Sequence, residues 1–322
     1  MRIAQLVFAG GERYPVLLDT DGIPDFWVTL YVTENLRSNL KQTAIENAVR
    51  HIIHLKLWEE FNERDLIAEL GVGLFLSDTD IISIRDHCLL HTQSLRKWHE
   101  SSITRKVSKL SLIHPTSTHH LPVISKAHTA NRLVHIAAFL HFTARTLLRE
   151  RADFVSQADA IDNLKKRIIT QKPKGQGRSG MANDPNAKAP PPAVFEKLMQ
   201  TVQEDSIDNP FKNSGVRKRN AIMFELLFET GMRSGEILAL EIGDVDYQSG
   251  TVSVVRRHDN PYDPRKRQPV PKTLPRDIPI SKFFAQRIRN YVMDVRAKIP
   301  GANKSPFLFV THNRLSRLNC TI

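Results

Sequence analysis

The stretch that decides the fold of this chain is Glu229-Thr230-Gly231-Met232-Arg233-Ser234-Gly235-Glu236-Ile237-Leu238-Ala239-Leu240. Gly231 follows an apolar run, which predicts a helix that ends in the left-handed conformation. A second apolar helix is expected to begin after Arg233, with Glu236 in its first turn. The stretch therefore predicts a junction of two helices that carries a permanent cation, where a phosphate group can be held.

Short helices and strands are expected on both sides of this junction. Helices are predicted at 194–202, at 220–228 (apolar nearly all round, and so buried) and at 281–295. Strands are predicted at 251–255 and 276–280, and Pro306 to Val310 forms a last apolar stretch. We assign residues 193–322 to one domain of mixed α and β structure.

The N-terminal half is expected to be mainly helical. Residues 35–170 are predicted as a helical domain with helices at 43–61, 66–70, 78–95 and 128–148, and with a basic loop at 101–126. The first of these helices opens on Thr43-Ala44-Ile45-Glu46, which has the form of a capping box. In the last one, Arg132 is expected to lie off the apolar face. Residues 1–34 are predicted as a β-rich extension with a strand at 26–32.

Residues 171–192 differ in composition from both neighbouring segments. They are rich in Gly, Pro, Lys and Asn, which cannot bury enough apolar area to offset the entropy of ordering. We interpret them as a basic inter-domain linker. Lys172, Lys174 and Arg178 are positioned there to follow a phosphate backbone.

The overall charge favours nucleic acid as a partner. The chain has 46 Lys and Arg against 34 Asp and Glu, a net charge of +12. Residues 251–300 hold twelve Lys and Arg and four Asp, so this window alone carries 12 − 4 = +8. No run of about 18 apolar residues predicts a membrane helix. Two cysteines do not make a disulfide framework, so a cytoplasmic setting is the default expectation.

Two segments, in order, resemble the catalytic domain of the tyrosine recombinases, the phage integrase family. One is the Arg233 stretch. The other is Lys272-Thr273-Leu274-Pro275-Arg276-Asp277-Ile278-Pro279-Ile280, which is similar to the family's β-hairpin lysine segment. The resemblance implies a mainly α fold, with a helical core-binding domain and a mixed α+β catalytic domain that has a small antiparallel sheet. This chain departs from the family in a long insertion, His258 to Pro271, and in the N-terminal extension.

The resemblance also implies roles for individual residues. Arg233 would clamp a phosphate, and Lys272 would donate a proton to the leaving 5′ oxygen, with Lys266, Arg265 and Arg267 as rivals for that role. Glu236 would orient the guanidinium or brace the site, or be only a first-turn helix residue. Fixed cations do this chemistry without a metal or other cofactor. The residues expected to contact DNA are Arg256, Arg257, Arg265, Lys266, Arg267, Arg276, Lys172, Lys174, Arg178 and Arg132.

A metal site at His87, Cys88 and His91 is the alternative that the histidine spacing suggests. His87 and His91 are four residues apart, but Cys88 faces another side of the helix and no Cys-x-x-Cys pair exists. We therefore expect no metal there.

The family's remaining catalytic groups are a His-x-x-Arg box and a nucleophilic tyrosine. We find neither in the expected context and expect a truncated family member. The resulting hypothesis is a protein that binds double-stranded DNA, assembles with other recombinase protomers as a tetramer, and does not cleave DNA alone. A non-catalytic DNA-binding regulator or inhibitory partner of a full-length recombinase is the alternative, and a helical adaptor with incidental basic charge is a third.

Overall fold

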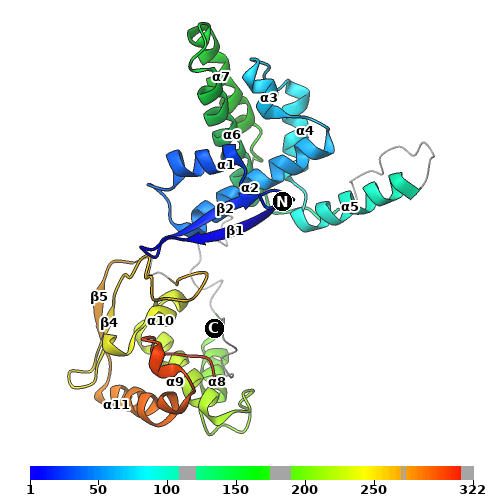
Figure 1. Cartoon of the computed structure of the whole chain (residues 1–322). Helices are drawn as coiled ribbons and strands as arrows, with labels where there is room; N and C mark the ends of the chain where they lie inside the picture. The colour runs from blue at the N-terminus through cyan, green and yellow to red at the C-terminus, as the bar shows by residue number, and fades with distance from the viewer. Residues whose placement is uncertain (109–120, 175–189, 270, 272, 313–322) are drawn as a thin grey trace. The chain divides into compact units, whose positions relative to one another are not determined.

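The computed structural model describes residues 1–108, 121–174, 190–269, 271 and 273–312 (Figure 1). The chain divides into two compact units. Unit 1 comprises Met1–Leu6 and Tyr14–Arg178, and unit 2 comprises Val7–Arg13 and Ser179–Ile322. The predicted site residues Arg178 and Lys272 lie outside the described residues.

Unit 1 is a helical domain with a two-stranded hairpin. Its elements are β1 (Arg2–Val7), β2 (Arg13–Leu18), α1 (Phe26–Tyr31), a π-helical turn (Val32–Leu36), α2 (Gln42–Phe61), α3 (Leu66–Gly71), α4 (Asp78–Cys88), α5 (Thr92–Ser108), α6 (Lys126–Leu148) and α7 (Phe154–Thr170). Helix α6 is central and packs against α2, α3 and α7. Leu133, Ile136 and Leu140 on α6 are at most 1% exposed, so the predicted apolar face of this helix is the core of the unit.

The strand predicted at 26–32 is wrong. Residues 26–31 form helix α1, which begins where the Asp25 carboxylate accepts a hydrogen bond from the Val28 amide at 2.9 Å. Val28 and Tyr31, nearly one turn apart, are both buried, and the Tyr31 ring packs on Phe139 of α6 at 5.6 Å between centroids. Aromatic and β-branched residues favour strands only as a tendency, and helical packing overrides it here.

Three other boundaries also differ from the sequence prediction. Helix α2 begins at Gln42 with no side-chain cap, so the Thr43 capping box does not form. The helix expected over 78–95 is two helices, because residues 89–91 leave the helical conformation and pair with residues 122–124. The Ile124 amide donates to the Leu89 carbonyl at 2.8 Å. Residues 101–108 continue α5 rather than forming a loop, and residues 109–120 lie outside the described residues.

Unit 2 surrounds a small antiparallel sheet with helices. Its elements are α8 (Pro192–Thr201), α9 (Ser214–Thr230), α10 (Ser234–Ala239), a 3₁₀ turn (Ile242–Asp244), β3 (Val245–Asp246), β4 (Thr251–Val254), β5 (Arg276–Pro279), α11 (Lys282–Asn290), a π-helical turn (Tyr291–Val295) and 3₁₀ turns at Arg296–Lys298 and Ala302–Lys304. The sheet order is β3-β4-β5, with Val252 opposite Ile278. The mainly helical architecture with small antiparallel sheets is confirmed.

The apolar helix of the sequence analysis is buried on one side only. In α9, Leu226 is fully buried, whereas Phe228 is 59% exposed. Residues 222 and 226 contact the core of unit 2, together with Phe284, Ile288 and Leu308. Gly231 at φ +61 ends α9 in the left-handed conformation, as predicted.

Candidate nucleic-acid interface

The junction between α9 and α10 fixes the backbone of Arg233 and exposes its side chain. The Gly231 amide donates to the Leu227 carbonyl at 3.1 Å, and Met232 is 3% exposed in the core of unit 2. Arg233 then adopts an extended backbone as the N-cap of α10. Its side chain is 62% exposed. The guanidinium is therefore accessible to a ligand at this junction.

Glu236 is the buried centre of this junction. Its side chain is 1% exposed, and its Oε2 accepts from the Arg233 amide at 2.9 Å and from Arg276 Nη2 at 2.9 Å. The Arg276 hydrogen bond is the main reason that the pKa of Glu236 falls to about 2. The Arg233 guanidinium lies farther away, at 3.8 Å from Oε1. Glu236 thus braces the backbone of Arg233 while leaving its guanidinium available to a ligand.

The segment before β5 is attached to the same carboxylate. The Thr273 hydroxyl donates to Glu236 Oε1, and Arg276 Nη1 contacts the Thr273 oxygen at 2.6 Å. The Arg276 side chain is 35% exposed, so it remains partly accessible to solvent while it pairs with Glu236. The structure therefore brings together Arg233, Glu236 and Arg276 of the residues expected at the site.

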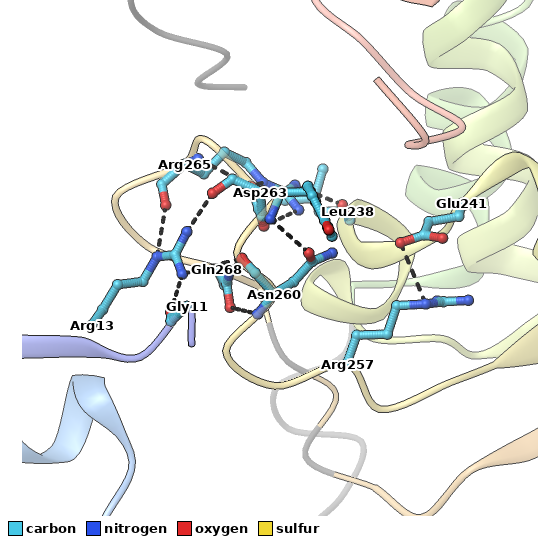
Figure 2. A network of polar contacts seen from close by, with 10 residues as sticks. Gly11, Arg13, Leu238, Glu241, Arg257, Asn260, Asp263, Arg265 and Gln268 are labelled. Carbon is cyan, nitrogen blue, oxygen red and sulfur yellow. Dashed lines mark hydrogen bonds and ion pairs between the residues drawn. The ribbon is translucent and has the colours of Figure 1, made fainter. Parts of the chain in front are cut away.

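Other basic residues of unit 2 are engaged within the protein. Arg257 pairs with Asp244 at 2.5 Å. It also pairs with Glu241 at 3.3 Å (Figure 2). Arg265 is 8% exposed, pairs with Asp263 at 2.8 Å, and lies over the Phe307 ring at 3.8 Å from the centroid. These contacts hold both guanidiniums in structural roles. Within the described residues, Arg256 is half-buried and its Nε has no hydrogen-bond partner.

The remaining expected contacts are exposed or lie in unit 1. Lys266 and Arg267 are exposed in unit 2, and Lys172 and Lys174 are exposed after α7. Arg132 is 4% exposed, so its predicted position off the apolar face is wrong. Its Nη1 donates to the carbonyls of Cys88 and Leu90 at 2.9 and 2.7 Å, which ties the break between α4 and α5 to α6. Helical periodicity does not anticipate such carbonyl partners.

The histidines near Cys88 are part of the packing of unit 1. His54 Nε2 lies 2.7 Å from the His87 carbonyl, and burial lowers the pKa of His87 to about 3 and raises that of Cys88 to about 12. Over the described ranges, no three His, Cys, Asp or Glu side chains gather to hold a metal ion. Nor is any helix in those ranges long and apolar enough to cross a membrane.

A basic groove in unit 1 was missed by the sequence analysis. It has a volume of about 1170 Å³ and is lined by Arg2, Arg50 and Arg96 with His51, His128 and His135. The His51 and His135 rings stack at 5.1 Å, and burial followed by the neighbouring His135 lowers the pKa of His51 to about 3. The spacing of His128 and His135, two helical turns apart, is the pattern that would have indicated one shared face.

The tyrosines of unit 2 occupy different environments. Tyr291 is 1% exposed, and burial raises its pKa to about 12. Burial likewise raises the pKa of the half-buried Tyr247. Tyr262 is 85% exposed.

Part of the chain is similar to a known protein family. Residues 191–320 match the Phage integrase family. Tyrosine recombinase XerC of Herpetosiphon aurantiacus is 26% identical over 149 residues, which is 44% of each chain. Tyrosine recombinase XerD of Oceanobacillus iheyensis is 25% identical over 142 residues, 42% of this chain and 43% of the relative. Tyrosine recombinase XerD of Vibrio vulnificus is 31% identical over 77 residues, 23% of this chain and 25% of the relative.

Each match spans less than half of the relative's length. No solved structure matches the chain. The family match covers the helix junction at Arg233, the three-stranded sheet and α11. Residues 191–320 therefore form a domain of the phage integrase family, the tyrosine recombinases.

Proposed function

We propose that this chain binds duplex DNA and that Arg233 contacts a backbone phosphate at the bond to be exchanged. The observation that carries the proposal is the geometry of the junction: the Arg233 backbone is held by buried Glu236, whereas its side chain is 62% exposed. An exposed, permanently charged guanidinium suits a phosphate because it offers two parallel hydrogen bonds.

Family membership supplies the reaction class, which is site-specific strand exchange in DNA. Attack on a phosphodiester places extra negative charge on the non-bridging oxygens, and fixed cations stabilise that charge. Arg233 would be the first of these cations. Lys272 would protonate the leaving 5′ oxygen, and a tyrosine would hold the 3′ phosphate in a covalent link that conserves the bond energy.

We further propose that this chain on its own binds DNA without forming that covalent link, and that other recombinase protomers complete a tetramer on DNA. A nucleophilic tyrosine needs access and a pKa that favours the phenolate. Tyr291 and Tyr247 have the opposite property, since burial raises both pKa values. Tyr262 is exposed, and so it is the residue to inspect if an adduct forms.

The test compares Arg233→Ala with Arg289→Ala, a control at an exposed arginine of α11. Binding of a labelled mixed-sequence duplex is measured over a salt series. Losing one phosphate contact should weaken binding and reduce the salt slope by about one for Arg233→Ala. Equal slopes for both variants would remove Arg233 from the interface. A suicide duplex, nicked so that a covalent intermediate is trapped, tests the second proposal: an adduct with the wild-type chain refutes it.

A further inference from the structure

Two segments that lie far apart in the sequence contact each other in unit 2. One is the N-terminal turn, residues 7–13, and the other is the connection loop, residues 258–268, between β4 and β5. Both belong to unit 2. Gly11, at φ +87, lies so close to the connection loop that a Cβ there would overlap the carbonyl of Asp259. The contact is therefore a close approach of two backbones.

Arg13 holds the connection loop through backbone carbonyls alone (Figure 2). It is 5% exposed. Its Nε donates to the Arg265 carbonyl at 3.2 Å and its Nη1 to the Asn260 carbonyl at 3.3 Å, while the carbonyls of Gly11 and Asp263 accept from Nη1 and Nη2. Four carbonyls thus share one guanidinium. This buried guanidinium stabilises the backbone conformation of the connection loop, because a buried carbonyl that loses its hydrogen-bond donor is energetically costly.

The connection loop is also braced from within and from α10. Gln268 Nε2 donates to the Asn260 carbonyl at 2.6 Å, and the Asn260 amide donates back to Gln268 Oε1 at 3.2 Å. Arg265 Nη1 donates to the carbonyl of Leu238 in α10 at 2.8 Å. The loop therefore has a defined conformation, although it contains no regular secondary structure.

This conformation exposes an aromatic ring and two basic residues. Tyr262, between Pro261 and Pro264, is 85% exposed, and Lys266 and Arg267 are exposed beyond the buried Arg265. A tyrosine hydroxyl can donate a hydrogen bond to a phosphate oxygen, and lysine and arginine contact phosphates without regard to sequence. An exposed aromatic side chain with neighbouring basic residues is the composition of a nucleic-acid contact.

We propose that the N-terminal turn and the connection loop form one DNA-contacting element, in which Arg13 is the positioning residue and Tyr262, Lys266 and Arg267 make the contact. This inference rests on the proposed binding of duplex DNA. It gives residues 7–13 a role in DNA binding by unit 2.

The experiment uses the full chain and two matched glycine variants. Gly11 and Gly22 have nearly the same φ, +87 and +85, so an alanine causes similar backbone strain at both. Only Gly11 faces another segment, since nothing lies within 4 Å of a Cβ at Gly22. Hydrogen exchange over residues 258–268 should rise in Gly11→Ala and stay at the wild-type level in Gly22→Ala. Arg13→Met provides the same readout if Gly11→Ala does not fold.

DNA binding is measured separately with the labelled mixed-sequence duplex. Tyr262→Ala should weaken binding about tenfold, as expected for one lost hydrogen bond to a charged phosphate, with unchanged hydrogen exchange. If hydrogen exchange over residues 258–268 is unchanged in both Gly11→Ala and Arg13→Met, the N-terminal turn does not position the connection loop and the proposed element is refuted. If the wild type binds the duplex and Tyr262→Ala binds it with the same affinity, the proposed contact between Tyr262 and DNA is refuted. A wild type that does not bind DNA refutes the proposed function and the contact together, while the exchange result still decides whether the element exists.

Discussion

Replacing Glu236 by Gln should destabilise unit 2 and remove part of its acid sensitivity. The carboxylate is 1% exposed and accepts from Arg276, Thr273 and the Arg233 amide. Its pKa of about 2, against an ordinary value near 4.5, corresponds to about 3 kcal/mol of stabilisation at neutral pH. Arg276 is about one third exposed and regains water when its partner is lost, so we expect a loss of about 2 kcal/mol in Glu236→Gln.

The pH dependence follows from the sign of this shift. Because the folded pKa is lowered, the stabilisation is fully present above the unfolded pKa near 4.5 and disappears as the pH falls toward about 2. Urea unfolding, followed by fluorescence of a reporter in unit 2, should therefore give different free energies of unfolding for the wild type and Glu236→Gln at pH 7. The two values should converge at pH 2 to 3.

Glu229→Gln is the matched control, because it removes the same charge from the same unit. The pKa of Glu229 is raised, by burial first and then by Glu225, so its neutralisation should not destabilise the unit. A difference between Glu236→Gln and the wild type that stays constant from pH 7 to pH 2 would refute the electrostatic argument. It would leave a purely steric role for Glu236.

Two further predictions concern the core and the groove of unit 1, and a third concerns the core of unit 2. Arg132→Met should lower the free energy of unfolding of unit 1 by about 2–4 kcal/mol in urea titrations, because the carbonyls of Cys88 and Leu90 lose a buried donor. His51→Phe should make unit 1 less sensitive to acid: the pKa of His51 is lowered to about 3, so the wild type loses stability as the pH falls below 6.5, by about 2 kcal/mol at pH 5. Unfolding at pH 7 and pH 5 checks this. Ile288→Ala, at a fully buried position of α11, should cost unit 2 about 2–5 kcal/mol in a urea titration.

Sequence periodicity predicted most helices because their apolar faces are buried as the pattern requires. Helix α6 and the turn at Gly231 are examples, since both depend on local spacing and local backbone conformation. The errors arose where distant groups decide the structure. Residues 26–31 are helical because α6 offers a packing surface, and Arg132 is buried because the carbonyls at the α4–α5 break need a donor.

Only the local contacts of the candidate site could be predicted from the sequence. The spacing of Arg233 and Glu236 lies within one helical turn, and the predicted bracing contact is local. The bond from Glu236 to Arg276 joins residues 40 apart, and the basic composition of 251–300 did not distinguish exposed residues from buried ones. Arg265 was expected to contact DNA, and its side chain is instead 8% exposed against Asp263 and Phe307.

The bond from Arg13 to the Arg265 carbonyl joins residues 252 positions apart in the chain. Unit 2 is therefore discontinuous in sequence, and its N-terminal part is synthesised long before the loop that it contacts. The contact cannot form before residues 258–268 have been synthesised, and the entropic cost of closing the loop grows only slowly with its length. A fragment that begins at the start of α8 would lack Arg13, and the carbonyls of Asn260, Asp263 and Arg265 would lose their shared donor. Expression of the C-terminal unit for biochemical work should therefore retain residues 7–13, either in the full chain or as a peptide supplied in trans.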